Sequence, residues 1–261
     1  MKIVKVLIIF ILISNCTTVP VTNRKQLNWV PDQIIKSISD SYYYSFLDDN
    51  YTMIEKDEKK IKRIKEISLN IENGIKKYFE INKMNYSKHN YDYELNIIKD
   101  KRTLNAFAMA NAKIVMYSRI IDFAETDDGI ATIISHEMGH VIAKHIHERV
   151  SQRITWDLLT LGIAEIFAEL GFFLPWSRMQ ESEADYLGIN FLYLAGYNPD
   201  APAIFWKKLD NYTNEVKKYK IDGDLLTAIN RRLPQWTKTH PSSNERYNNL
   251  KKWSEEVKSK Y

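Results

Sequence analysis

The sequence is poor in the residue types on which several common classes of protein depend. Its 261 residues include one cysteine and eight glycines, and the net charge is only +4. A lone cysteine excludes an internal disulfide, and no glycine-rich loop for binding phosphate groups is present. Lysines and acidic residues are interspersed without a concentrated basic face, so no nucleic acid is expected as a partner. The hydrophobic content of 44% is typical of a globular protein with a substantial core.

The position of the single cysteine is more informative than its number. Lys2 and Lys5 precede an apolar stretch from Val6 to Ile13, which is the pattern of a secretion signal. About ten apolar residues are too few to span a bilayer comfortably. The residues up to Cys16 resemble a lipobox, although Asn15 stands where a small residue is usual. We therefore expect residues 1–15 to form a lipoprotein signal peptide and Cys16 to carry a lipid, with a plain signal peptide or an uncleaved anchor as the alternative.

The rest of the chain alternates between strand and helix patterns. Residues 16–31 carry little periodic pattern and suit a tether, so the main domain is expected over residues 32–261. Apolar and polar residues alternate over 91–97, and the short apolar runs 105–109 and 113–117 are also strand-like, with Ala110-Asn111-Ala112 between them. Three- and four-residue apolar spacing predicts helices over 32–47, 56–81, 128–149, 155–170, 178–195, 201–217 and 242–258. The predicted fold class is α+β and mostly helical, with helices around a small sheet.

One predicted helix carries a metal-binding pattern. His136-Glu137-Met138-Gly139-His140 is an HExxH motif, and a spacing of four places both imidazoles on one helix face. The two histidines can then bind one metal ion from the same side, and Glu137 can reach a water molecule on that ion. The alternative is a surface helix with two unrelated histidines. Apolar residues flank the motif on both sides, however, and burying these polar groups needs a reason.

A third ligand has to come from another segment. Glu181, Glu183 and Asp185 are chemically suitable, and Glu181 and Asp185 lie four residues apart on one predicted helix face, whereas Glu183 points elsewhere. The alternative for this acidic run is a solvated helix face.

HExxH followed by Glu181-Ser182-Glu183-Ala184-Asp185 resembles the HExxH…ExxAD pattern of the zinc peptidase family that includes the CAAX prenyl endoprotease, HtpX and the envelope proteases BepA and LoiP. The resemblance extends to Thr239-His240-Pro241 with Arg246, and to residues 18–27, which resemble the start of the lipoprotein branch. It implies a zincin-like active-site helix packed on a small sheet, and one zinc ion held by His136, His140 and Glu181. Ala110-Asn111-Ala112 departs from the Pro and Gly that family members often carry there.

The motifs also suggest roles for residues around the metal. Glu137, next to the first histidine of HExxH, is expected to act as general base, and the spacing of Asp185 from Glu181 suggests that Asp185 orients a ligating histidine. The resemblance suggests that His240 approaches the metal, either as its fourth ligand at rest or as a group that stabilises the oxyanion; a surface histidine in a loop is the alternative. Arg246 is expected to anchor the loop of His240 by a salt bridge, with a plain surface role as the alternative. His89, His145 and His147 are interpreted as structural or surface residues.

The predicted strand of Asn105, Ala106, Phe107 and Ala108 is expected at the edge of the zinc cleft, where a substrate could add as a further strand; an ordinary core strand is the alternative. Unfolded or extended polypeptides are therefore the expected substrates. We expect a zinc endopeptidase, lipid-anchored in a bacterial cell envelope at the outer membrane and facing the periplasm, that removes unfolded or misassembled envelope proteins. The alternatives are a lipid-anchored, chaperone-like binding protein with an idle or self-inhibited zinc site, and a zinc hydrolase acting on another amide such as a cell-wall peptide.

Overall fold

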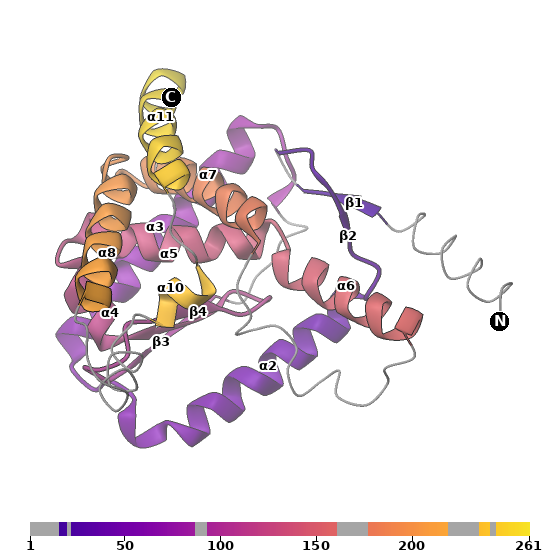
Figure 1. The fold of residues 1–261 in the computed structure, drawn as a ribbon, viewed down its shortest axis with the longest axis horizontal. Helices are drawn as coiled ribbons and strands as arrows, with labels where there is room; N and C mark the ends of the chain where they lie inside the picture. The colour runs from indigo at the N-terminus through magenta and orange to yellow at the C-terminus, as the bar shows by residue number, and fades with distance from the viewer. Residues whose placement is uncertain (1–15, 20–21, 87–92, 161–176, 219–234, 241–243) are drawn as a thin grey trace, which may run out of the picture.

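The computed structural model describes residues 16–19, 22–86, 93–160, 177–218, 235–240 and 244–261. Helices predominate and surround a small sheet (Figure 1), which confirms the predicted α+β, mostly helical class. The elements in chain order are β1 (Cys16–Thr18), β2 (Lys25–Leu27), α2 (Asp32–Asp49), η1 (Tyr51–Met53), α3 (Glu58–Ile81), β3 (Glu94–Ile98), β4 (Ala106–Ala108), β5 (Lys113–Tyr117), α4 (Ser118–Ala124), α5 (Asp127–Ile142), α6 (His145–Thr160), α7 (Arg178–Leu194), α8 (Ala201–Lys218), α10 (Gln235–Thr239) and α11 (Asn244–Lys260).

Helix α5, which carries HExxH, lies at the buried centre of the fold. The side chain of Thr126 caps its first turn by accepting a hydrogen bond from the amide of Gly129 at 3.1 Å. Every residue from Gly129 to Ile142 is buried, because α3, α7 and β4 all pack against this helix. The apolar residues on both sides of HExxH are therefore core residues.

Helices α5 and α7 approach each other unusually closely. A Cβ atom on Gly139 would lie 2.5 Å from the carbonyl oxygen of Ala184, so only glycine fits there. Helix α7 begins at a capping box, in which the Ser177 hydroxyl accepts a hydrogen bond from the Gln180 amide and the Gln180 side chain returns to the Ser177 amide. Together these features place the first turn of α7, with Glu181, beside HExxH.

The sheet of three strands has the order β3-β5-β4. Strands β3 and β5 are parallel, with Leu95 opposite Ile114, and β4 is antiparallel to β5, with Phe107 opposite Val115. The turn between β4 and β5 is closed at Ala112, which has a φ of 64°. As predicted, 110–112 is a tight connection and β4 lies at an edge of the sheet in the part of the chain that the structure describes.

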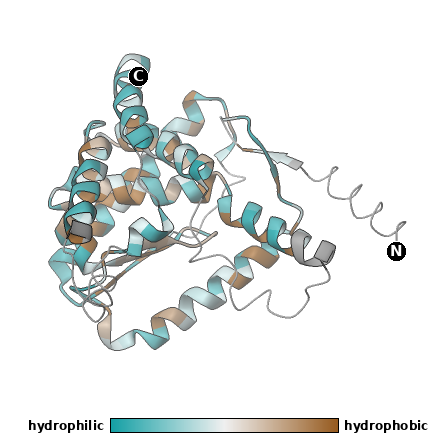
Figure 2. Cartoon of the chain, viewed as in Figure 1, coloured by the Kyte–Doolittle hydropathy of each residue, from teal (hydrophilic) through white to brown (hydrophobic). Residues whose placement is uncertain are grey.

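Helices cover both faces of this sheet. Ala106, Ala108 and Ile114 belong to the large core that includes α5. Phe107 and Val115 point to the opposite face and pack with residues of α2 such as Tyr43. The outer helices α8 and α11 carry hydrophobic and hydrophilic residues on the same helix (Figure 2), as expected of amphipathic helices that cover a core.

The segment 16–31 contains more structure than a tether. Strands β1 and β2 pair antiparallel, with Thr17 opposite Gln26, and the side chain of Val19 is fully buried. The Arg24 side chain reaches carboxylates of α6 and α7. The weak periodicity of this segment reflects strands of only three residues, which are too short to show an alternating pattern.

The predicted helix over 128–149 is wrong in one respect, because the chain breaks it in two. Helix α5 ends at Ile142 and α6 begins at His145, and Lys144 between them has a φ of 54°. A residue with positive φ cannot continue a right-handed helix. Helix α6 takes in the start of the predicted helix 155–170, and the remainder of that helix lies outside the described residues, as does His89.

Helices α2, α3, α7, α8 and α11 agree with their predictions to within about two residues where the chain is described. Among the described helices, none combines the length and the apolar character needed to cross a membrane.

Candidate metal centre

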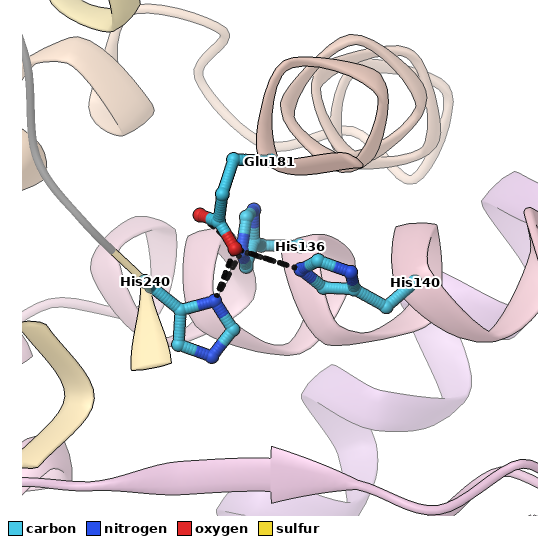
Figure 3. A group of neighbouring side chains, drawn as sticks. All are labelled: His136, His140, Glu181 and His240. Atoms are coloured by element: carbon cyan, nitrogen blue, oxygen red, sulfur yellow. Dashed lines mark hydrogen bonds and ion pairs between the residues drawn. The ribbon is translucent and has the colours of Figure 1, made fainter. Parts of the chain in front are cut away.

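Four side chains from three elements converge at one point. His136 and His140 extend from α5, Glu181 from α7, and His240 follows α10 (Figure 3). His136 Nε2 lies 3.2 Å from His140 Nε2 and 3.2 Å from His240 Nδ1. Glu181 Oε1 lies 3.4 Å from His140 Nε2 and 2.8 Å from His240 Nδ1.

These separations fit a tetrahedral zinc ion. Zinc–nitrogen and zinc–oxygen bonds of about 2.0–2.1 Å in a tetrahedron place the ligand atoms roughly 3.3 Å apart. All four candidate ligand atoms lie within 4.8 Å of one another. The donor set of three imidazoles and one carboxylate, without cysteine, also suits zinc.

The electrostatic environment keeps two of the donors, His140 and Glu181, in the form that binds metal. Burial lowers the pKa of His140 well below its usual value, so its imidazole is neutral. Burial alone would raise the pKa of Glu181, but the neighbouring His240 and Arg246 hold it well below the ordinary range. Metal binding requires a neutral imidazole and an ionised carboxylate, and both are present.

Glu137 lies between this cluster and strand β4. Its Oε2 atom accepts a hydrogen bond from the amide of Ala108 at 3.1 Å, and its Oε1 atom accepts one from Trp236 Nε1 at 3.0 Å. Oε1 is also 3.4 Å from His240 Nε2. Burial raises the pKa of Glu137 to about 7 despite the opposing effects of His136 and of these hydrogen bonds. A carboxyl group with such a pKa can accept and return a proton near neutral pH.

Asp185 lies behind His136, where the sequence predicted it. His136 Nδ1 is 2.9 Å from Asp185 Oδ1. Arg246 donates two hydrogen bonds of 2.7 Å to the Asp185 carboxylate, and its Nη1 atom lies 2.5 Å from Glu181 Oε2. The Arg246 guanidinium also lies 3.8 Å from the centre of the Trp206 ring. Arg246 therefore ties α11 to Glu181 and Asp185 on α7, whereas its salt bridge was expected to anchor the loop of His240.

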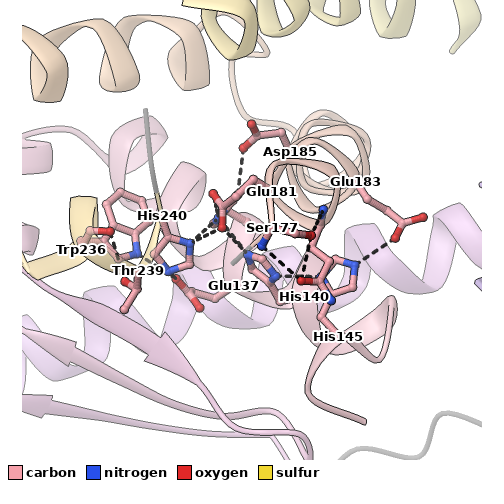
Figure 4. Close-up of polar contacts among 12 residues, drawn as sticks. Glu137, His140, His145, Ser177, Glu181, Glu183, Asp185, Trp236, Thr239 and His240 are labelled. Carbon is pink, nitrogen blue, oxygen red and sulfur yellow. Dashed lines mark hydrogen bonds and ion pairs between the residues drawn. The ribbon is translucent and has the colours of Figure 1, made fainter. Parts of the chain in front are cut away.

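His145 occupies a place that the sequence analysis did not assign to it. It is fully buried, with Nδ1 at 2.8 Å from His140 Nδ1 and Nε2 at 2.9 Å from Glu183 Oε2 (Figure 4). In a continuous helix, a residue five positions after His140 would point well away from the ligand face. The break at Lys144 brings His145 back toward His140, so periodicity could not have revealed this contact. Glu183 points away from the metal cluster, as predicted, but toward His145.

His147 lies on the other side of α6, where Nε2 is 3.3 Å from Asp32 Oδ1. It is buried and joins α6 to the start of α2, a structural position.

Strand β4 presents only part of its backbone to the metal side. Asn105 and Met109 bond to β5, through the amide of Tyr117 at 3.1 Å and the carbonyl of Lys113 at 2.8 Å. Because main-chain groups alternate along an antiparallel strand, those of Ala106 and Ala108 point to the outer edge. The Ala108 amide donates to Glu137 there. Of the four residues predicted to bind substrate, Ala106 and Ala108 have the required backbone orientation, whereas Asn105 and Phe107 face β5.

The buried HExxH helix, the third ligand on a separate helix and the adjacent edge strand define a metallopeptidase. Residues 69–254 match the model of peptidase family M48, and the chain belongs to that family.

Relatives cover most of the chain. The mitochondrial metalloendopeptidase OMA1 of Schizosaccharomyces pombe is 25% identical over 252 residues, covering 93% of this chain and 67% of that protein. The protein of the same name from Saccharomyces cerevisiae is 26% identical over 249 residues, which cover 90% of this chain and 68% of the yeast protein. The beta-barrel assembly-enhancing protease of Yersinia pestis is 23% identical over 175 residues, which cover 59% of this chain and 33% of that protein. The predicted family and the predicted metalloendopeptidase activity are confirmed, and zinc is the cofactor that the family and the cluster indicate.

Proposed function

We propose that this protein is a membrane-anchored zinc endopeptidase that cleaves unfolded or misassembled proteins of a bacterial cell envelope. The observation that carries the proposal is the position of Glu137, between the His136, His140 and Glu181 cluster and the outer edge of β4. A site that only bound zinc would have no need of a buried carboxylate there. Glu137 links the place where a metal is held to the place where a peptide can lie.

The residues would divide the work of hydrolysis among them. His136, His140 and Glu181 hold the zinc ion, which when bound supplies Lewis-acid chemistry that polarises a peptide carbonyl and makes water a nucleophile at neutral pH. Glu137 accepts the proton of the attacking water and delivers it to the leaving amine. Asp185 fixes the ring of His136 through the 2.9 Å contact at Nδ1.

The outer edge of β4 suits an extended polypeptide. A substrate that adds as a strand would bond to the main chain of Ala106 and Ala108, and main-chain bonds carry little sequence information. This favours unfolded chains with loose cleavage preference.

The position of His240 supports a site that is closed at rest. His240 provides a fourth protein ligand atom, whereas catalytic zinc sites keep one position open. The amide of Trp236 at the start of α10 also donates to the carbonyl of Leu104, on the same edge of the strand as Ala106. We infer that α10 and His240 hold the enzyme in a self-inhibited state and leave when a substrate strand binds. The same observation supports the second candidate function, a chaperone-like binding protein whose zinc site stays idle.

The proposed location rests on the N-terminal sequence. Residues 1–15 have the pattern of a signal peptide that ends at Cys16, the start of β1. One relative is named for β-barrel assembly and others for mitochondria, so the relatives do not assign a compartment to this chain. We propose a lipid at Cys16 and an outer-membrane position facing the periplasm. Replacing Cys16 by Ser should release the protein from the membrane fraction and remove labelling by a fatty acid.

The central test compares zinc-loaded wild type with Glu137→Gln in the cleavage of casein. Cleavage by the wild type alone, abolished by a chelator, would support the peptidase and the role of Glu137. His240→Ala should cleave faster than wild type, because it opens the fourth position; slower cleavage would instead show that His240 stabilises the oxyanion. If the wild type and both variants bind zinc and none of the three cleaves casein, the chaperone-like function is favoured. Cleavage of a cell-wall peptide but not casein would redirect the assignment to another amide.

A further inference from the structure

We propose that the N-terminal hairpin β1–β2 is part of the metal site, because Arg24 positions the zinc ligand His140 through Glu183 and His145. This inference rests on the proposed zinc site and adds a role for a segment that lies outside the region matched to the family model. Arg24, Glu183 and His145 are positioning residues in this proposal, since none of them belongs to the metal cluster itself.

The contacts form an unbroken chain from the hairpin to the metal cluster. Arg24 Nε donates to Glu183 Oε2 at 2.9 Å, and the Thr22 hydroxyl donates to Glu183 Oε1. Glu183 Oε2 is 2.9 Å from His145 Nε2, and His145 Nδ1 is 2.8 Å from His140 Nδ1. His140 Nε2 then faces His136 Nε2 and Glu181 Oε1 in the cluster.

This chain of hydrogen bonds selects the tautomer of His140 that can bind metal. An ionised Glu183 can only accept hydrogen bonds, so His145 Nε2 must carry a hydrogen and donate it to Glu183. A neutral His145 then has a lone pair on Nδ1 and accepts a hydrogen bond from His140 Nδ1. With its hydrogen on Nδ1, His140 directs the lone pair of Nε2 at the cluster. Histidine ligands of zinc are commonly oriented by such an outer partner, and here the partner is a second histidine backed by a carboxylate.

Arg24 is what makes this arrangement stable. The side chains of Glu148 and Glu183 are only 3% and 5% exposed, and Arg24 bridges them with four contacts of 2.7 to 2.9 Å. Two buried carboxylates without a cation between them would repel each other and would draw in water or protons. Without Arg24, Glu183 would therefore lose the position from which it holds His145.

The hairpin in turn holds Arg24. The Val19 amide donates to the Arg24 carbonyl at 2.8 Å, and Gln26 accepts from Arg24 Nη2 at 3.1 Å. Arg24 lies eight positions after Cys16, the residue proposed to carry the lipid. The point of membrane attachment and the orientation of a zinc ligand are thus coupled through one short segment of chain.

The test measures zinc affinity in the full mature chain by competition with a chromophoric chelator. His145→Ala and Arg24→Ala should each weaken zinc binding by about 10- to 100-fold, the usual effect of losing an outer partner of a ligand. Lys25→Ala is the matched control, since Lys25, the first residue of β2, is exposed and follows Arg24 directly. The zinc affinity of this variant should stay within about twofold of wild type. The double variant Arg24→Ala/His145→Ala should bind zinc no more weakly than His145→Ala, because both changes break the same chain of contacts.

A second measurement separates positioning from general stability. At saturating cobalt in place of zinc, Arg24→Ala and His145→Ala should both shift the visible absorption of the metal, whereas Lys25→Ala should not. If Arg24→Ala does not fold, Arg24→Lys serves instead, because it keeps the charge but loses the planar fork that bridges two carboxylates.

Equal affinity of the Arg24 and Lys25 variants, or additive losses in the double variant, would overturn this inference. A wild-type chain that binds no zinc would instead overturn the proposed function.

Discussion

Gly139→Ala should separate the two helices that carry the metal ligands. Gly139 lies inside HExxH, and a Cβ atom there would be 2.5 Å from the carbonyl oxygen and 2.9 Å from the Cα atom of Ala184. Contacts below 3.0 Å are essentially never tolerated by a real Cβ atom, and both obstacles are backbone atoms. Helix α7 would therefore have to move by at least about 0.5 Å, in a core that is packed as closely as a crystal.

The movement acts on stability and on metal binding to different degrees. Overpacking of a core costs about 1–3 kcal/mol, but alanine is favoured over glycine inside a helix by about 1 kcal/mol. The net loss in the free energy of unfolding should thus be at most about 2 kcal/mol. Ligand distances in zinc sites vary by only about 0.2 Å, so a displaced Glu181 should weaken zinc binding by about tenfold or more.

The assay combines urea unfolding of the metal-free protein with zinc titration against a chelator. Gly129→Ala is the matched control on the same helix: its Cβ atom would lie 2.5 Å from the carbonyl oxygen of Ala124, which does not belong to α7. Gly188→Ala, where the nearest atoms lie at 3.1 Å, gives a milder version for the case that Gly139→Ala does not fold. If Gly139→Ala lost stability but bound zinc as tightly as Gly129→Ala, the close approach of α5 and α7 would not be what places Glu181.

Four other changes test the remaining parts of the site and its support. Ser177→Ala removes the capping box of α7 and should lower the free energy of unfolding by about 1 kcal/mol in urea titrations. Trp236→Phe keeps the stack on Trp206 but removes the hydrogen bond to Glu137. Losing this bond should destabilise the closed state by about 1 kcal/mol and speed casein cleavage roughly fivefold. Unchanged turnover would argue against α10 as the inhibitory element. The hydrogen bond from His147 and the charge of Lys144 hold the pKa of Asp32 below its ordinary range. The stability that the ionised Asp32 carboxylate contributes is therefore present above about pH 4 and is lost as the pH falls further. Asp32→Asn should therefore destabilise by less than about 1 kcal/mol at pH 7, since Asp32 is largely exposed, and the difference from wild type should vanish in acid. Removal of zinc by a chelator should lower the melting temperature, and adding zinc back should raise it by an amount that grows with the free zinc concentration.

The two histidines that α5 contributes to the metal cluster could be predicted from the sequence because their spacing is local. The spacing of four between His136 and His140 fixes their common face in any helix, and the same rule put Glu181 and Asp185 together on α7. The identity of the third ligand came from the resemblance to a family, because chemistry alone left Glu181, Glu183 and Asp185 open. The structure places Glu181 in the cluster and Asp185 behind His136.

The supporting residues could not be predicted in the same way. The contact of His145 with His140 depends on the positive φ of Lys144, and a lysine carries no sequence signal for that conformation. The contacts of Arg24 with Glu148 and Glu183 span 124 and 159 positions of the chain. Strands of three residues are likewise too short for periodicity to detect, which is why the hairpin that carries Arg24 was interpreted as a tether.

The charges around the site explain why a divalent cation fits there. The two ligating histidines of α5 each lead to a set of two buried carboxylates and one arginine. Glu181, Asp185 and Arg246 surround His136, and Glu148, Glu183 and Arg24 lie beyond His145, which contacts His140. With the carboxylates ionised, each set carries one net negative charge, and Arg149 nearby offsets part of the total through its interaction with Glu181 and Glu148. A buried excess of negative charge is costly in a low dielectric, and a zinc dication at the junction of the two sets neutralises it. Because the two arginines come from opposite ends of the described chain, this balance exists only once both ends have folded onto the α5–α7 pair. We therefore expect zinc affinity to depend on the packing of both Arg24 and α11 in the described part of the chain, which the HExxH helix alone cannot reproduce.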